Sequence, residues 1–417
     1  MKPIFSPSRR ELLALGAAGL ALPGRARAAT ARQRRFLFVH AAGGWDPVFV
    51  FAPMFHAPDV YTPLDSTTAQ LGDFTFVDSP NRPLTRAFFE RWASRCCVIN
   101  GLEVRSITHE RCRQVVLTGG AGGGDDWPSI LASRAPEALM PYVVGSGPAF
   151  SARFSDLVVR LGSGSQFERL RSGQALADSD TPILAPSSAA DAAVARYLSQ
   201  RGESFTRNNS GAMARYGSAN AESLQRMAQM QALAPELGAG APDDLHLESL
   251  PLIDCLEQGL SRCAMVAHEG LYDRGWDNHA DIELQTYHYE DLFEGLDLLL
   301  ADLEGRSGTA GGSLLDETTV VVFSEMGRTP ILSALGGKDH WTFTSALIIG
   351  SGVAGGRVVG GYTDALRGAP TSLDDGAVTD SGVAMTASHL GATLLALGDV
   401  DPGEFLGDIE PIQAAIA

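Results

Sequence analysis

Residues 320–328 read VVVFSEMGR, and this stretch decides the fold. Its apolar start, dominated by β-branched residues, is typical of a buried strand in a parallel sheet. The strand runs into Glu325 and Arg328, which places polar side chains at its carboxyl end. Ligands of open α/β sheets bind at that end of the strands. A second polar pair, Asp339-His340, leads into another strand-like run at residues 346–350, so we expect a site here.

Strands and helices alternate along much of the chain. Strand-like runs lie at residues 35–40, 97–101, 261–268 and 319–323, and helical patterns lie at 84–95, 106–117, 130–134 and 281–304. This alternation predicts a mostly parallel sheet with helices on its faces. We interpret residues 29–417 as one domain, in which residues 160–250, rich in Gly, Ser, Ala and Pro, form a largely helical insertion or cap.

The first 28 residues are interpreted as an export signal rather than as part of the fold. Arg9 and Arg10 precede an apolar segment at 12–22 and the sequence Ala26-Arg27-Ala28. This order is typical of the twin-arginine signal followed by a small-residue cleavage site. The apolar segment is too short to span a bilayer. We therefore expect the twin-arginine machinery to export the protein to the periplasm, with no integral membrane span in the mature chain.

The composition excludes several classes of function. Hydrophobic residues make up 45% of the chain, and the formal net charge is −17. A basic surface that could neutralise nucleic-acid phosphates is not expected, so nucleic acid is excluded as a partner. The five cysteines form no Cys-x-x-Cys pair and are too few to be a disulfide scaffold, although their odd number leaves at least one thiol unpaired in a monomer.

Acids and imidazoles recur at the predicted strand ends and helix starts: Asp46, His109, Asp277, His279, Glu325, Asp339 and His340. Together they suit a divalent metal that polarises an oxygen or activates a nucleophile. Each also has a purely structural interpretation, because Asp46 can cap a turn and Arg328 can form a salt bridge with Glu325. Their recurrence at one edge of one sheet favours a site.

Several motifs together resemble a known family. They are Trp276-Asp277-Asn278-His279, residues 324–329 (SEMGRT), Gly337-Lys338-Asp339-His340 and the glycine-rich residues 355–360, with further agreement at 43–46 and 108–119. In these motifs the chain resembles the DUF1501 family, exported bacterial proteins of the alkaline phosphatase and sulfatase superfamily. The resemblance implies a doubly wound α/β fold, alkaline phosphatase-like, with metals at the carboxyl ends of the strands.

The resemblance also implies a ligand set. Asp277, His279 and His340 would match the first metal site of the superfamily, and Asp46 and Glu325 would match carboxylates of the second. Asp339 accompanies His340 as a further candidate ligand. Imidazoles and carboxylates suit zinc, whereas an oxygen-rich second site would tolerate calcium, manganese or magnesium.

The chain departs from hydrolytic members of the superfamily at two places. Met326 stands where an Asp-His pair would supply a ligand, and a thioether is a poor ligand for a hard divalent ion. The expected nucleophile position falls on or next to His109. Thr108 is therefore either a metal-activated nucleophile or only a helix cap, and in the second case His109 is a ligand.

The resemblance and the residues together predict an exported metal-dependent hydrolase of small phosphate or sulfate esters. Arg328 would hold the anionic group, and Thr108 or His109 would face the scissile centre. Residues 160–250 are expected to set specificity. The alternative is a non-catalytic cell-envelope binding or assembly protein that keeps a structural metal, and a third possibility, suggested only by the export route, is an oxidoreductase.

Overall fold

The computed structural model describes residues 33–161, 188–233, 237, 244–272 and 275–417. The export signal expected at residues 1–28 lies outside these residues. Eight strands form the main sheet, in the order β12-β4-β11-β8-β1-β7-β5-β6. Their bounds are β1 Arg35–Ala41, β4 Cys96–Glu103, β5 Tyr142–Val144, β6 Val158–Arg160, β7 Cys263–His268, β8 Thr318–Ser324, β11 Phe343–Gly350 and β12 Arg357–Val359.

The main sheet is mostly parallel, as expected. Strand β11 is the exception, because it pairs antiparallel with both β4 and β8. The other pairs along the sheet are parallel. Since β11 runs in the opposite direction, it begins at the edge where its neighbours end. The residues just before β11 therefore lie beside the loops that follow β4 and β8.

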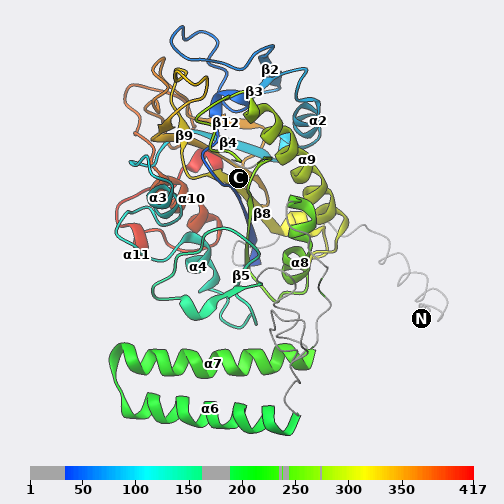
Figure 1. Ribbon diagram of the computed structural model, residues 1–417, viewed down its shortest axis with the longest axis vertical. Helices are drawn as coiled ribbons and strands as arrows, with labels where there is room; N and C mark the ends of the chain where they lie inside the picture. The colour runs from blue at the N-terminus through cyan, green and yellow to red at the C-terminus, as the bar shows by residue number, and fades with distance from the viewer. Residues whose placement is uncertain (1–32, 162–187, 234–236, 238–243, 273–274) are drawn as a thin grey trace, which may run out of the picture.

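Helices cover both faces of the sheet, which confirms the doubly wound α/β class (Figure 1). One core lies between the sheet and α2 (Pro83–Trp92), α8 (Leu245–Glu257) and α9 (Leu284–Gly305). The other lies between the sheet and α3 (His109–Thr118), α4 (Trp127–Ala132) and α10 (Ala387–Leu397). Along β1, Leu37 and Val39 belong to the first core and Phe36 and Phe38 to the second, the alternation that a strand buried on both faces produces.

Smaller elements surround the main sheet. Strands β2 (Thr67–Leu71) and β3 (Phe74–Asp78) form one antiparallel pair, and β9 (Gly327–Arg328) and β10 (His340–Trp341) form another. The short helices are α11 Gly403–Leu406 and the 3-10 turns η2 Pro47–Phe49, η3 Ala93–Arg95, η4 Ser155–Leu157, η5 Leu314–Glu317 and η6 Gln413–Ala415. Among the described residues, no helix is both long and apolar enough to cross a membrane.

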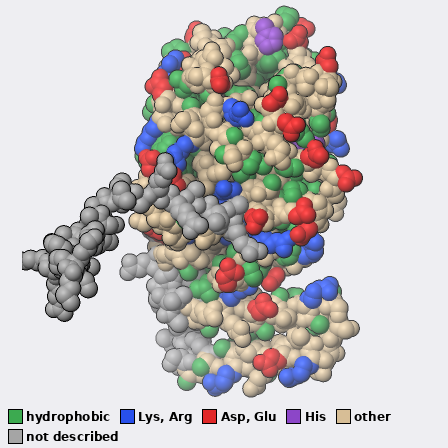
Figure 2. Space-filling model, turned by 180° about the vertical axis from the view of Figure 1, so that it is seen from behind, with side chains coloured by type: hydrophobic (Ala, Val, Ile, Leu, Met, Phe, Trp, Pro, Cys, Tyr) green, Lys and Arg blue, Asp and Glu red, His purple; other side chains and the backbone are tan. Residues whose placement is uncertain are grey.

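The described part of residues 160–250 is largely helical. Helices α6 (Ser188–Asn208) and α7 (Gly211–Leu233) form a hairpin at the lower end of the molecule, far from β9 (Figure 1). From behind, the hairpin projects below the body and carries side chains of both charges (Figure 2). Arg226 of α7 donates to the carbonyl oxygens of Pro136 and Asp156 in the body. Because α6 and α7 lie away from β9 and β10, these two helices do not cap the polar edge described below.

Candidate metal centre

Four chain segments meet at the carboxyl edge of the main sheet. Helix α3 begins at His109 after β4, and the segment that follows β7 carries Asp277 and His279. Strand β10 precedes β11 and carries His340, which lies opposite Arg328 of β9. The reversed direction of β11 is what brings His340 to this edge. Residues 277 and 340, remote along the chain, thereby become neighbours.

Each of the three histidines is held by its Nδ1 atom. Nδ1 of His109 lies 2.9 Å from Oε1 of Glu325, and Nδ1 of His279 lies 3.1 Å from Oδ1 of Asp339. Nδ1 of His340 lies 2.7 Å from the carbonyl oxygen of Ile107. These oxygens are acceptors, so each Nδ1 carries the hydrogen and donates it. In the neutral ring, each Nε2 then carries a free lone pair.

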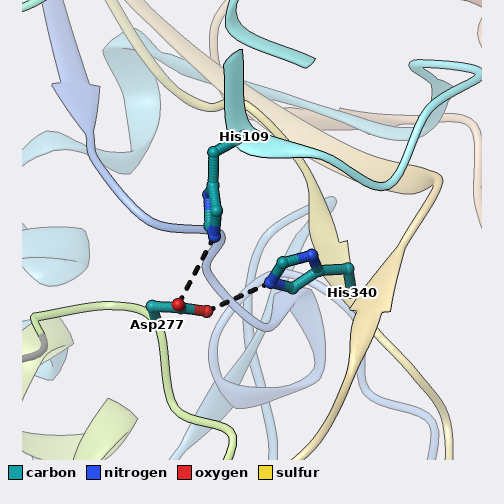
Figure 3. Close-up of side chains that lie close together, drawn as sticks. All are labelled: His109, Asp277 and His340. Carbon is teal, nitrogen blue, oxygen red and sulfur yellow. Dashed lines mark hydrogen bonds and ion pairs between the residues drawn. The ribbon is translucent and has the colours of Figure 1, made fainter. Parts of the chain in front are cut away.

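The three Nε2 atoms converge on the Asp277 carboxylate (Figure 3 shows His109, Asp277 and His340). Nε2 of His109 lies 3.4 Å from Oδ2, whereas Nε2 of His279 and of His340 each lie 3.2 Å from Oδ1. The Nε2 atoms of His279 and His340 are 2.9 Å apart. Two lone pairs at this separation repel each other unless a cation or a proton lies between them.

The donor set fits a transition metal. One ligand atom from each of His109, Asp277 and His340 lies within 4.8 Å of the other two. His279 adds a third imidazole against the same carboxylate. Three imidazoles and one carboxylate suit zinc, which can also take a fifth ligand, whereas calcium and magnesium favour all-oxygen sites. The Nδ1 contacts are the outer interactions that orient metal-binding histidines in proteins.

The charges of the cluster are strongly coupled. Hydrogen bonds to Asp277 and then to Glu325 raise the pKa of His109 to about 9, against the opposing effect of burial. Burial alone would raise the pKa of Asp277, but its contacts with His109, His340 and Arg328 hold that pKa well below its usual value. The metal-free cluster therefore carries a protonated His109 beside an ionised Asp277 at neutral pH.

Solvent reaches the cluster. The side chains of His109 and His340 are 21% and 19% exposed, and those of Asp277 and His279 are 36% and 37% exposed. A buried structural metal site is closed on all sides, whereas a catalytic site keeps one position open. This exposure allows a water molecule or a substrate group to approach the cluster.

Glu325 and Asp339 lie behind the cluster rather than in it. Glu325 is fully buried and accepts from His109, from the backbone N–H of Gly43 and from Ser324 Oγ. Burial raises the pKa of Glu325, but its hydrogen bonds with His109 and His40 outweigh burial and hold that pKa well below the usual range. Both carboxylates were expected to be ligands; their geometry instead orients His109 and His279.

Arg328 lies where a substrate does not reach it. Its guanidinium is fully buried and donates to Asp277 and to the carbonyl oxygens of Gly43, Gly44, Trp276 and Lys338. Arg328, expected to hold the substrate anion, is thus buried and donates to protein acceptors. The guanidinium ties three loops together beneath Asp277.

Asp46 also lies apart from the cluster. Its Oδ2 atom accepts from Lys338 Nζ at 2.7 Å, and both side chains are fully buried. Its Oδ1 atom caps the turn that begins at Pro47. Asp46, expected at a second metal site, is thus paired with Lys338 and lies outside the cluster of His109, Asp277 and His340. Capping, the alternative interpretation, is what the turn shows.

Thr108 occupies the N-cap position of α3, but its side chain makes no capping hydrogen bond. The side chain is exposed next to His109. The Thr108 hydroxyl therefore does not cap the helix, which was one of the two interpretations offered for this residue. Met326 is fully buried in the apolar core beside α3 and α10, away from solvent.

Sequence reasoning missed two residues of the centre. His40, at the end of β1, places Nε2 3.0 Å from Oε2 of Glu325, opposite the contact with His109. Ile107 contributes its carbonyl oxygen to His340. A histidine at the end of a buried strand was the available signal for His40, because an imidazole rarely lies in such a strand without a partner. A backbone carbonyl leaves no such signal.

Residues 255–375 match the family model described as "Protein of unknown function (DUF1501)". The match covers this stretch of the chain and not the rest. Three of the four clustered side chains, Asp277, His279 and His340, lie within the matched stretch, whereas His109 lies before it. A comparison with curated protein sequences gives no match.

Solved structures similar to the chain include a sulfatase and a transferase. The PsFucS1 sulfatase from Pseudoalteromonas sp. has 10% identity and a TM-score of 0.39, with 99% of this chain and 76% of that chain covered. The phosphoethanolamine transferase EptA from Neisseria meningitidis has 11% identity and a TM-score of 0.36, with 88% and 55% covered. BT4656, solved with its substrate D-glucosamine-2-N,6-O-disulfate, has 9% identity and a TM-score of 0.32, with 91% and 81% covered. Identities this low concern the fold alone.

Proposed function

We propose that the protein is an exported, zinc-dependent hydrolase of phosphate or sulfate esters. The observation that carries the proposal is the convergence of three Nε2 atoms on the Asp277 carboxylate. Each imidazole is already turned by an oxygen acceptor at Nδ1, so little reorganisation is needed when zinc binds. His109, Asp277, His279 and His340 would hold the ion.

The chemistry assigned to the site uses the exposure of the cluster. Zinc, when bound, would supply Lewis-acid chemistry toward an ester oxygen and a nucleophile at neutral pH. Asp277 and the three imidazoles fix the position of that charge, while Glu325 and Asp339 keep the rings in the correct tautomer. Thr108, exposed beside His109, is the candidate for a protein nucleophile.

The alternative is a non-catalytic envelope protein with a structural metal. It is favoured by the burial of Arg328, which leaves the anionic group of an ester without the partner first expected. Elemental analysis of the purified protein, combined with a screen of chromogenic phosphate and sulfate esters, separates the two. Bound zinc and turnover lost in His340→Ala support the hydrolase. Zinc without turnover, and a large loss of stability on chelation, support the alternative.

Zinc affinity is expected to depend on pH. Because the pKa of His109 is raised to about 9, its ring is protonated at neutral pH, and zinc must displace that proton. The apparent affinity should therefore rise about tenfold for each pH unit up to about pH 9 and then level off. Competition with a chromophoric chelator between pH 6 and 10 measures this. A flat profile over that range would contradict the assignment of His109 as a ligand.

His40 is expected to act on zinc affinity without touching the metal. The His40 ring contacts Oε2 of Glu325, and Oε1 of the same carboxylate contacts the His109 ring. His40→Gln should therefore loosen the orientation of His109. Loss of such an outer contact should weaken zinc binding by about 10- to 100-fold. The matched control is His389→Gln, a buried histidine that caps α10 and is not part of the cluster. Equal zinc affinity in the two variants would disprove this role.

A further inference from the structure

Arg113 lies beside the metal centre on α3. It follows His109 by one helical turn, so both side chains project from the same face of the helix. Its Nε atom lies 3.6 Å from Oε1 of Glu325, the oxygen that accepts from Nδ1 of His109 at 2.9 Å. The guanidinium is therefore positioned within a few ångströms of the ring that carries a candidate ligand atom.

Arg113 differs from the other cations near the site. Arg328 and Lys338 are fully buried and donate to carbonyls and carboxylates around them. The side chain of Arg113 is 35% exposed, while its Nε atom is buried without a hydrogen-bond partner among the described residues. The solvent-exposed area of Arg113 therefore lies on side-chain atoms other than Nε.

Arg113 does not form a hydrogen bond with Glu325. A separation of 3.6 Å is longer than a hydrogen bond. The carboxylate of Glu325 is already shared among His40, His109 and the N–H of Gly43. Two imidazoles and an amide thus stabilise its negative charge, and the guanidinium keeps donors for a further oxyanion. A planar guanidinium suits the paired oxygens of phosphate and sulfate.

We propose that Arg113 binds the anionic group of the substrate beside the metal centre. This inference rests on the proposed function, and it assigns to Arg113 the role that the burial of Arg328 leaves open. It also narrows the substrate class to esters whose phosphate or sulfate group keeps a negative charge, because a neutral ester gives the guanidinium nothing to bind.

The test is titration calorimetry on the zinc-saturated full chain, with inorganic phosphate and inorganic sulfate as separate probes. Arg113→Gln should weaken binding of the preferred anion by about 10- to 100-fold, the usual effect of losing charge-assisted hydrogen bonds. Arg113→Lys keeps the charge but not the paired donors and should lie between. Arg111→Gln is the matched control, since Arg111 is an exposed arginine of the same helix that bonds to the carbonyl oxygen of Ala121.

Three outcomes overturn the inference. The first is that Arg113→Gln binds both anions as tightly as the wild type does. An equal loss in Arg111→Gln would reduce the effect to general charge. Weaker zinc binding with unchanged anion affinity at saturating zinc would make Arg113 only a support for Glu325. Each of these three outcomes leaves the proposed function standing. If instead the zinc-loaded wild type binds neither anion at millimolar concentration, the proposed function fails as well, so the two failures can be told apart.

Discussion

Asp277→Ala is expected to lower zinc affinity by about 10²- to 10³-fold. Zinc binding by four protein ligands is worth about 10–16 kcal/mol, so one ligand contributes roughly a quarter of that energy. Asp277 is also the group on which all three Nε2 atoms converge, and its loss leaves them facing one another. Competition with a chelator of known affinity measures the change.

The variant needs two controls, because Asp277 also pairs with the buried Arg328. Asp277→Asn keeps an oxygen near Arg328 and removes the charge, which separates lost coordination from lost folding. Asp339→Ala removes a carboxylate that contacts the outer nitrogen of His279 and should cost less zinc affinity than Asp277→Ala. Equal zinc affinities in Asp277→Ala and Asp339→Ala would contradict the ligand assignment.

Lys338→Met is expected to lower the free energy of unfolding by about 3–5 kcal/mol. The ammonium of Lys338 donates to Asp46 at 2.7 Å and to the carbonyl oxygen of Tyr61 at 3.0 Å, and both members of the pair are fully buried. Methionine has a similar shape but leaves the Asp46 carboxylate without its partner. Urea denaturation followed by tryptophan fluorescence measures the loss.

The pH dependence of this loss has a definite sign. Burial already raises the pKa of Asp46, and removal of the lysine charge raises it further. When the pKa of an acid is higher in the folded state than in the unfolded state, the protein loses stability as the pH rises through the folded-state pKa. The deficit of Lys338→Met should therefore grow with pH, and the double variant Asp46→Leu/Lys338→Met should recover much of it. A double variant as unstable as the single one would contradict the buried-pair explanation.

Five of the eight strands of the main sheet, β1, β4, β7, β8 and β11, could be predicted from local sequence, whereas the short strands β5, β6 and β12 were not predicted. The apolar run ending at Phe323 became β8, and the run at 261–268 became β7, because a strand buried on both faces needs continuous apolar residues. The direction of β11 could not be predicted in the same way. An apolar run reads alike in both directions, so only the folded sheet shows that His340 precedes an antiparallel strand.

The candidate site was predictable in its members but not in their roles. Asp277, His279 and His340 were expected together and lie together. Asp46 and Arg328 occur in other motifs of the same resemblance, yet their side chains point beneath the loops, where Lys338 and backbone carbonyls bind them. A sequence gives residue types at a strand end but not the side on which each side chain leaves the backbone.

The helical insertion shows the same limit. Residues 160–250 were expected to form a largely helical insertion, and α6 and α7 lie within this stretch. Their place in the fold depends on contacts made elsewhere in the chain. Because α6 and α7 lie at the far end of the molecule from β9, specificity is better sought in residues around the cluster, such as Arg113 (Figure 1).

Anomalous diffraction at the zinc absorption edge, from crystals of the protein grown with zinc, tests the central claim most directly. We predict one strong peak per chain, about 2.0–2.1 Å from Nε2 of the coordinating histidines among His109, His279 and His340, and about 2.0–2.2 Å from an Asp277 oxygen. A peak elsewhere in the molecule, or none at these four side chains, would contradict it.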